Sequence, residues 1–320
     1  MRALPPVARL RAGVFTSAEA SAAGWTRKSL EHGLRTGRLL RLQRGVWCDA
    51  TDLAAPAPGP AADLLLVRRA VAAALVTRGG IVSHLAAARL DGLPVWAPAP
   101  RACITLTQRT RGVTDRVHTH RAAVREGRML HDIVHTTTVR TILDITREHG
   151  VEAGLVTADA ALHSGEVTLD DLVAGVAAAP PAPGRRRLVD LLTLVDGRAE
   201  SPLESRSRWH MREHAVPPPR PQVVIRTRDG RVLGRVDFFW ADGVVGEVDG
   251  NVKYRRDGDR DDEGIREKWR QEFLERTGLL VVRWGARDLL DFAPVARLIA
   301  DRRERVRRPG WPCDWVATPT

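Results

Sequence analysis

The stretch of residues 234–254, which reads GRVDFFWADGVVGEVDGNVKY, constrains the fold of this chain more than any other. Two runs rich in β-branched and aromatic residues, 231–240 and 244–249, flank the short sequence ADG. A short loop that ends in glycine between two such runs is typical of a β-hairpin, because glycine readily adopts the left-handed conformation. A loop of these three residues pairs Trp240 with Val244, which predicts a sheet of defined register.

This register brings carboxylates together. It places Asp237 opposite Glu247, and Asp249 shares the face of Glu247 because side chains alternate along a strand. Cβ atoms of cross-strand neighbours lie about 5 Å apart, and like charges at that distance repel. Three carboxylates on an otherwise apolar hairpin are costly unless a cation lies between them. Because the ligands would be oxygens, with no His or Cys set nearby, the pattern favours Mg²⁺ or Mn²⁺.

The carboxylates fit metal-dependent hydrolysis of a phosphodiester bond. In that reaction a metal ion generates hydroxide and stabilises the leaving oxygen. We expect Asp237 and Glu247 to bind the metal, with the carbonyl oxygen of Val248 close enough to join them. Glu204 is expected in the first turn of a helix, where it orients water or holds a second ion. The predicted catalytic carboxylates are therefore Glu204, Asp237, Glu247 and Asp249.

An alternative interpretation takes Asp237 and Glu247 as surface residues on a solvated sheet face. Phe239 and Val245 share that face in the predicted register, which argues against its full exposure. We therefore favour a metal site over a solvated face.

Lysine is scarce in this chain. Of 50 basic residues, only Lys28, Lys253 and Lys268 are lysine, and two of these three follow the hairpin. A lysine ammonium is a compact point charge, so a site that requires such a charge would keep lysine. We expect Lys253 or Lys268 to polarise the phosphate or to assist proton transfer. Chance placement is the alternative, because the lysines are so few.

The N-terminal residues 1–52 predict a winged helix-turn-helix. Thr16 or Ser17 can cap a first helix, Thr26 can cap a second, and residues 39–47 resemble a small hairpin wing. Residues 1–50 contain nine Lys or Arg and three acidic residues. A small helical hairpin with a solvated basic face is the alternative, but wing and charge together favour DNA binding. The expected DNA-binding residues are Arg27, Lys28, Arg35, Arg38, Arg41 and Arg44.

Residues 60–177 lie between two linkers, 51–60 and 176–187, and are expected to form a small α/β region. Arg140 and Asp144 are spaced as an i, i+4 ion pair. We expect the histidines of this region to be satisfied or solvent-facing, because their spacing does not suggest a metal site. They are His84, His118, His120, His131 and His135.

Charge and cysteine content limit the class of protein. The net charge of +11 favours a polyanionic partner. The three cysteines lie far apart and form no CxxC pair, so a reducing cytoplasm is expected. No run approaches the roughly 20 apolar residues of a membrane span, so we expect a soluble cytoplasmic protein and no membrane partner.

Several N-terminal motifs carry a family resemblance. The segments GVFTSAEASAAGWTRKSL, GRLLRLQRGVW, SHLAAARLDGLP, VRTILDI and TADAALHSG follow one another between residues 10 and 175. In this order they resemble the AbiEi-type antitoxin family of type IV toxin–antitoxin systems. The resemblance implies a winged helix-turn-helix followed by an α/β domain. It also implies a non-enzymatic repressor of its own operon, with a cognate nucleotidyltransferase toxin as a possible partner.

A second resemblance covers residues 201–299. The segments SPLES, GRVDFFW, GEVDGNVKY and REKWRQEFLERTGLLVVRW resemble the restriction-endonuclease-like superfamily, and in particular domains akin to very-short-patch-repair endonucleases. This resemblance implies a Mg²⁺-dependent DNA nuclease. The third motif of such domains is usually acidic–x–Lys, and Asp249 stands here at the lysine position. Lys253 or Lys268 could substitute for that lysine, or the activity could be lost.

Together these observations predict an α+β multidomain protein. We expect a winged helix-turn-helix at 1–52, an AbiEi-like α/β domain at 60–177, and a restriction-endonuclease-like mixed sheet flanked by helices at 186–310. The favoured function is Mg²⁺-dependent hydrolysis of double-stranded DNA. The alternative is a non-catalytic DNA-binding transcriptional regulator or type IV antitoxin with a degenerate nuclease domain. The sequence leaves RNA as a substrate and the oligomeric state open.

Overall fold

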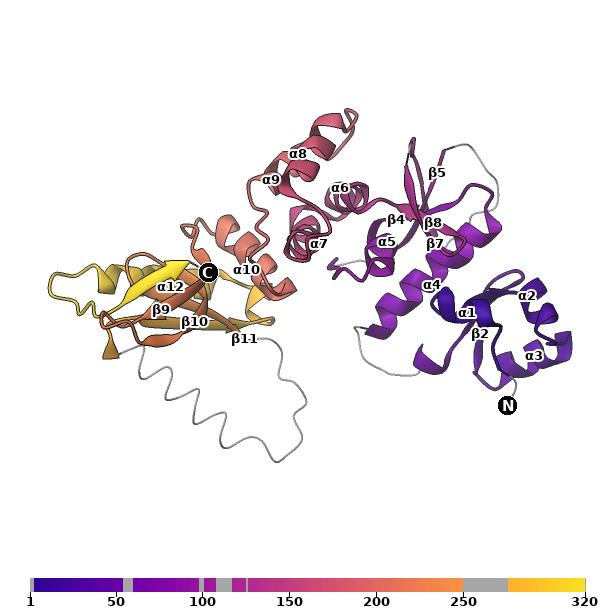
Figure 1. Ribbon diagram of the computed structural model, residues 1–320, viewed down its shortest axis with the longest axis horizontal. Coiled ribbons are helices and arrows are strands. Elements are labelled where there is room, and N and C mark those ends of the chain that lie inside the picture. The colour runs from indigo at the N-terminus through magenta and orange to yellow at the C-terminus, as the bar shows by residue number, and fades with distance from the viewer. Residues whose placement is uncertain are drawn as a thin grey trace. The chain divides into compact units, whose positions relative to one another are not determined.

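The computed structural model describes residues 3–53, 60–97, 101–107, 117–124, 126–249 and 276–319. The chain divides into two compact units, whose helices and strands are drawn in Figure 1. Unit 1 comprises Met1–Thr157 and Gly165–Leu192, and unit 2 comprises Ala158–Ser164 and Thr193–Thr320.

Residues 3–53 of unit 1, here called the N-terminal module, combine short helices with a small sheet. The elements are α1 (Pro6–Leu10), β1 (Val14–Thr16), α2 (Ser17–Ala22), α3 (Arg27–Arg35), β2 (Leu39–Gln43), β3 (Val46–Asp49) and the 3₁₀ helix η1 (Thr51–Leu53). The strands pair antiparallel in the order β1-β3-β2. The predicted helices and hairpin are therefore present, and β1 is a third strand that the sequence did not predict.

Capping boxes set the start of α2 and of α3. The Thr16 hydroxyl accepts a hydrogen bond from the Glu19 N–H, and the Glu19 carboxylate accepts one from the Thr16 N–H. Thr26 and Ser29 form the same reciprocal pair at the start of α3. Both predicted caps are thus confirmed. Leu34 of α3 is exposed.

The remainder of unit 1 is a mixed sheet with helices. Its elements are α4 (Pro60–Val76), β4 (Ile81–Ser83), α5 (His84–Leu90), β5 (Ala102–Leu106), β6 (Val117–Arg121), β7 (Gly127–Leu130), β8 (Ile133–Thr136), α6 (Thr138–His149), most of α7 (Val151–His163), α8 (Leu169–Ala178) and α9 (Arg185–Leu192). The strand order is β6-β5-β4-β8-β7. The neighbouring strands β5 and β6 pair parallel.

Two local expectations in this region are settled by the structure. The predicted ion pair forms, since the Arg140 Nε lies 2.8 Å from the Asp144 carboxylate. The second linker is shorter than predicted, because α8 continues to Ala178 and α9 begins at Arg185. Alanine and arginine both favour helix, so residues at both ends of the expected linker are helical.

Unit 2 contains a second mixed sheet. Its elements are α10 (Pro202–Glu213), β9 (Arg220–Arg226), β10 (Val232–Trp240), β11 (Val244–Asp249), β12 (Leu280–Gly285), the 3₁₀ helix η2 (Asp288–Leu290), α12 (Ala293–Val306) and β13 (Val316–Pro319). The strand order is β12-β11-β10-β9-β13, and the β11–β12 pair is parallel. Trp240 pairs with Val244, as the hairpin sequence predicted.

Two apolar clusters pack the strands of this sheet. Phe238, Trp240 and Trp284 pack with Met211 of α10 and with residues of α12, including Ile299. A second cluster contains Val223, Ile225, Val236, Phe239, Val245 and Val281. Among the described strands, β12 ends the sheet. Its residues are nevertheless apolar because Val281 packs in one cluster and Val282 in the other.

The helices of the described residues do not include one that is both long enough and apolar enough to cross a lipid bilayer.

Buried arginines fasten the N-terminal module to the rest of unit 1. Arg68 of α4 is 2% exposed, and it donates hydrogen bonds to the carbonyl oxygens of Ala12 (2.5 Å) and Asp49 (2.6 Å). Arg11 is also buried and pairs with Glu19 and with Asp132, between β7 and β8. These contacts tie the orientation of the module to that of the larger sheet.

We therefore expect Arg68→Met to lower the free energy of unfolding by about 3 kcal/mol, because two buried carbonyl groups lose charged donors. Urea unfolding followed by tryptophan fluorescence measures this change. The matched control is Arg78→Met, since Arg78 is exposed, and its effect should stay within about 0.5 kcal/mol. Equal effects of the two substitutions would contradict the anchoring role.

Candidate functional site

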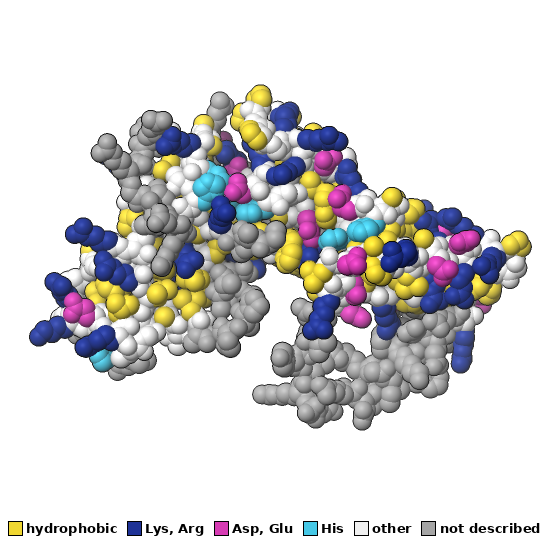
Figure 2. Space-filling view, turned by 180° about the vertical axis from the view of Figure 1, so that it is seen from behind, with side chains coloured by type: hydrophobic (Ala, Val, Ile, Leu, Met, Phe, Trp, Pro, Cys, Tyr) yellow, Lys and Arg dark blue, Asp and Glu magenta, His cyan; other side chains and the backbone are white. Residues whose placement is uncertain are grey.

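The first candidate site is the basic surface of the N-terminal module. Five of the six predicted DNA-binding side chains are exposed, and Arg38 is half-buried. Figure 2 shows Lys and Arg side chains in dark blue along the lower-left edge, where this module lies. They come from two elements, α3 and the β2–β3 hairpin, which is the distribution expected of a helix and wing that contact DNA together. Their role in DNA binding stays a prediction.

Aromatic side chains orient two of these cations. The guanidinium of Arg38 lies 5.5 Å from the ring centre of Trp25, and that of Arg41 lies 5.7 Å from the ring of Trp47. Both tryptophans are buried core residues of the module, so the arginines lie over a rigid support. Arg27 forms an exposed i, i+4 ion pair with Glu31. Such pairs contribute only about 0.5 kcal/mol, so a phosphate could displace the glutamate.

The second candidate site crosses the sheet of unit 2. Phe238 pairs with Gly246 on one side and with Pro221 on the other. Extended by one residue, these registers place Asp237 beside Glu247 in β11 and beside Gln222 in β9. Glu247 in turn pairs with Arg283 of the parallel strand β12. We call these four residues, Gln222, Asp237, Glu247 and Arg283, the polar row.

Each acidic member of the polar row has a partner within the protein. The Asp237 carboxylate accepts a hydrogen bond from the Val248 N–H at 2.8 Å. Glu247 is 6% exposed, and Arg283 donates to its Oε2 from Nε (2.9 Å) and Nη2 (2.8 Å). A guanidinium therefore supplies positive charge where the sequence suggested a metal ion. This contact was not predictable from the sequence, in which Arg283 only interrupts an apolar strand.

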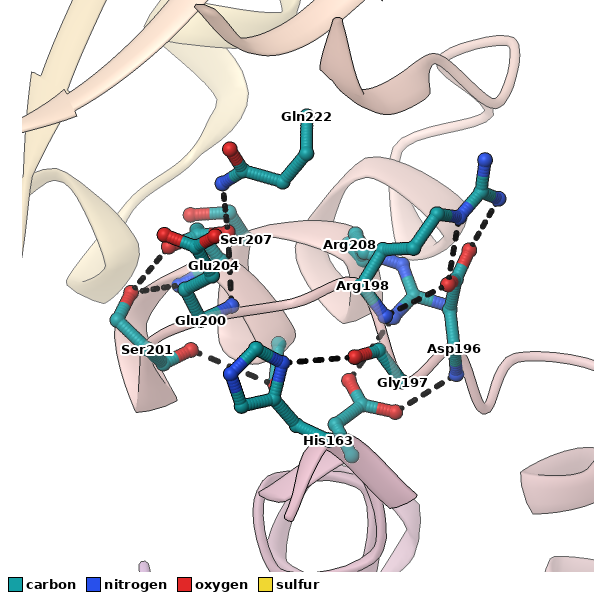
Figure 3. A network of polar contacts seen from close by, with 12 residues as sticks. His163, Asp196, Gly197, Arg198, Glu200, Ser201, Glu204, Ser207, Arg208 and Gln222 are labelled. Carbon is teal, nitrogen blue, oxygen red and sulfur yellow. Dashed lines mark hydrogen bonds and ion pairs between the residues drawn. The ribbon is translucent and has the colours of Figure 1, made fainter. Parts of the chain in front are cut away.

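Glu204 joins the polar row through Gln222. Ser201 caps α10, and the buried carboxylate of Glu204 accepts hydrogen bonds from the Ser201 hydroxyl and the Gln222 amide, each at 2.8 Å (Figure 3). Gln222 is buried and has a positive φ of 51°, which a non-glycine residue adopts only at a cost. Sequence reasoning missed Gln222. The available signal was a polar residue inside the apolar run PQVVI.

The side chains of β10 change faces at Asp237, although the register of β10 against β9 is the same on both sides of this residue and shifts instead between Val232 and Gly234. Val236 and Phe238 are two residues apart and should share a face, yet they pack in different apolar clusters. Gln222, its neighbour in the polar row, carries the positive φ. Irregular strand positions redirect side chains and are frequent near functional sites. The change of face at Asp237 and the positive φ at Gln222 thus occur at two neighbouring polar residues within the sheet.

The predicted metal ligands do not form a compact group among the described residues. Groups of three metal-capable side chains with ligand atoms within 4.8 Å of one another occur there only in unit 1. Val248 offers its N–H to Asp237, and Asp249 is exposed. Lys253 and Lys268 lie outside the described residues. The Mg²⁺ or Mn²⁺ site therefore stays a prediction.

His84 has a partner in the Ser83 hydroxyl and His118 is exposed, as expected, whereas the sequence did not indicate that His84, His118 and His120 lie close together. His84, His118 and His120 belong to two groups whose ligand atoms lie within 4.8 Å of one another. Their wide sequence separation hides this arrangement, because it is created by the pairing of β4, β5 and β6.

A buried ion pair holds α10 against the end of α7 within unit 2. Asp159 is 1% exposed, and it accepts hydrogen bonds from Arg208 and from the Asp196 N–H, both at 2.8 Å. Nearby, His163 contacts the carbonyl oxygen of Gly197 at 2.9 Å (Figure 3). Burial raises the pKa of Asp159 to about 6, although the charge of Arg208 opposes this shift. This pair fixes the helix that carries Glu204.

Comparison with known proteins gives two findings. Residues 2–48 match a family model described as a transcriptional regulator, AbiEi antitoxin. Two uncharacterized proteins from two strains of Mycobacterium tuberculosis are each 37% identical to the chain over 105 residues. That match covers 32% of this chain and 37% of each relative, so little more than a third of the relatives' length is shared.

The buried Asp159 leads to a prediction about pH. Its folded-state pKa of about 6 exceeds the ordinary value of 3.8, so the folded state binds the proton more tightly. The stability contributed by this proton is complete below pH 4 and is lost as the pH rises through 6. The loss amounts to about 3 kcal/mol.

We expect the difference in unfolding free energy between wild type and Asp159→Asn to change by about this amount between pH 4 and pH 7. Urea titrations at both pH values measure it. Asp301→Asn serves as the control because Asp301 is exposed on α12 and should give a pH-independent difference. The same pH-independence in Asp159→Asn would show that Asp159 does not titrate as described.

Proposed function

We propose that this protein is a DNA-binding transcriptional regulator of the AbiEi antitoxin type. The observation that carries the proposal is that the family match and the exposed cations fall in the same part of the chain. The residues that match the regulator family, 2–48, are those of the module whose α3 and β2–β3 hairpin display the cations. Neither finding depends on the other, since one compares sequences and the other is a property of the folded surface.

In this proposal α3 enters the major groove of double-stranded DNA and the β2–β3 hairpin follows the adjacent backbone. Arg27 and Lys28 occupy the first turn of α3, and Arg35 occupies its last turn. Arg41 and Arg44 extend from the hairpin toward phosphates, so they contribute affinity more than sequence preference. The stacking of Arg38 and Arg41 on tryptophans reduces the entropy that these side chains lose on binding.

The biological setting of the proposal is autoregulation together with a cognate toxin. The family description supports an antitoxin role for the module. Unit 2 lies outside the family match, so its contribution is a separate question.

A second candidate function, Mg²⁺-dependent hydrolysis of DNA, concerns unit 2. The register that places Asp237 beside Glu247 favours it, as does the buried Glu204 that reaches the polar row through Gln222. A divalent ion between Asp237 and Glu247 would have to compete with Arg283 for the Glu247 carboxylate. This competition makes regulation the better supported function.

DNA binding is tested on the promoter region upstream of the protein's own gene. We expect the double variant Arg35→Gln/Arg44→Gln to bind at least tenfold more weakly near physiological salt, because two phosphate contacts are lost. Fluorescence anisotropy at several salt concentrations should also show the slope of log affinity against log salt reduced by roughly 1.8. Arg78→Gln, which removes one positive charge at an exposed site outside the module, is the control. The proposed surface would be rejected if the loss of affinity for each charge removed were the same in the double variant and in the control.

Nuclease activity is tested separately with supercoiled plasmid and either Mg²⁺ or Mn²⁺. If unit 2 is a nuclease, wild type nicks the plasmid and Asp237→Asn is slower by at least a hundredfold, since the substitution removes a charged ligand. Asp301→Asn should cleave like wild type. Absence of divalent-dependent cleavage by wild type, alongside intact promoter binding, would leave regulation as the sole function.

A further inference from the structure

Nitrogen and sulfur side chains converge on the sheet of unit 1. The strands β4, β5 and β6 lie next to one another in the sheet. Ser83 at the end of β4 pairs with Cys103 of β5, which in turn pairs with His118 of β6. His120 lies two residues beyond His118 and therefore on the same face. His84 follows Ser83 directly, so three neighbouring strands deliver these groups to one place.

The convergence is close enough for one metal ion. The ligand atoms of His84, Cys103 and His120 lie within 4.8 Å of one another, and so do those of His118, His120 and Glu148. The imidazole ring centres of His84 and His120 are 3.9 Å apart, and those of His118 and His120 are 4.2 Å apart. His120 belongs to both groups.

The hydrogen bonding of this cluster is incomplete. His120 Nε2 is buried and has no hydrogen-bond partner among the described residues. Thr105 pairs with His120 across the strands, and its hydroxyl is also buried without a hydrogen-bond partner among the described residues. A buried polar atom without a partner costs about 1–3 kcal/mol. A ligand that accepts the lone pair of a ring nitrogen would remove the cost at His120.

The backbone places His84 for a ligand role. His84 is 4% exposed and has a positive φ of 57°, which is unfavourable for a non-glycine residue. Such strain is frequent where a side chain must take one particular direction. Its Nδ1 contacts the Ser83 hydroxyl at 2.9 Å, which leaves Nε2 as the ligand atom. Metal-binding histidines usually engage their second nitrogen in this way.

We propose that His84, Cys103 and His120 bind one divalent cation of the zinc class. Two imidazole nitrogens and one thiolate form a borderline-soft set that selects Zn²⁺ over Mg²⁺ or Ca²⁺. His118 belongs to the neighbouring group with His120 and Glu148, its Nδ1 lying 3.4 Å from the Glu148 carboxylate, so the fourth position of the proposed site is left to water. Binding converts the Cys103 thiol to thiolate and releases its proton to solvent, so charge and protons balance. The site lies outside residues 2–48 and does not depend on the proposed DNA-binding surface.

The test uses the purified, metal-free full chain and Co²⁺ as a spectroscopic probe. We expect one Co²⁺ per chain, with the intense visible bands of tetrahedral coordination and a near-ultraviolet thiolate-to-metal band that Zn²⁺ abolishes by displacement. Cys103→Ser should lose the thiolate band, and His120→Asn should weaken binding at least tenfold. Cys313→Ser and His32→Asn, which change exposed residues elsewhere, should keep the wild-type spectrum.

Thermal unfolding supplies an independent readout. Zn²⁺ should raise the melting temperature of wild type and of the two control variants, but not that of Cys103→Ser. His84→Asn is used if His120→Asn does not fold, because asparagine tolerates the positive φ of this position, and the same weakening is expected. A Co²⁺ spectrum without the thiolate band, or one unchanged by Cys103→Ser, would overturn the proposal. So would the absence of stoichiometric binding.

Discussion

Two buried carboxylates of unit 2 are each paired with an arginine, and these ion pairs position the polar side chains around them. Glu247 is almost fully buried in the parallel pair of β11 and β12, and a carboxylate there is tolerated only with a cation beside it. Arg283 supplies that cation from the directly paired position of the neighbouring strand. The same rule applies at Asp159, which is buried against Arg208. One pair holds the end of the sheet and the other holds α10, so together they position Glu204, Gln222 and Asp237.

How much was predictable depends on the sequence distance over which each interaction acts. The caps at Thr16 and Thr26 and the hairpin pairing of Trp240 with Val244 involve residues a few positions apart, and all three were predictable. The pairing of Glu247 with Arg283 joins residues far apart in the chain, and parallel pairing leaves no local signature. The sequence therefore indicated that a cation was needed and could not say which one.

The histidines of unit 1 show the same limit in another form. His118 and His120 have the i, i+2 spacing of one strand face, but a metal site also needs ligands from other strands. His84 and Cys103 come from elements whose adjacency depends on the strand order β6-β5-β4, with β5 and β6 parallel. Ligand spacing along the chain is informative for a site built on a loop or hairpin. It carries little information for a site built across a sheet.

Arg11 and Arg68, which are both buried in the described part of unit 1, separate the structural from the functional use of positive charge. Arg11 donates hydrogen bonds to Glu19 and Asp132, and Arg68 donates to backbone carbonyl oxygens, so neither side chain is available to DNA. The cations of α3 and the β2–β3 hairpin are exposed and rest on aromatic or weak ionic contacts. Net charge alone does not distinguish these groups. The fold does, because it places one set where desolvation requires internal partners and the other where phosphate can replace water.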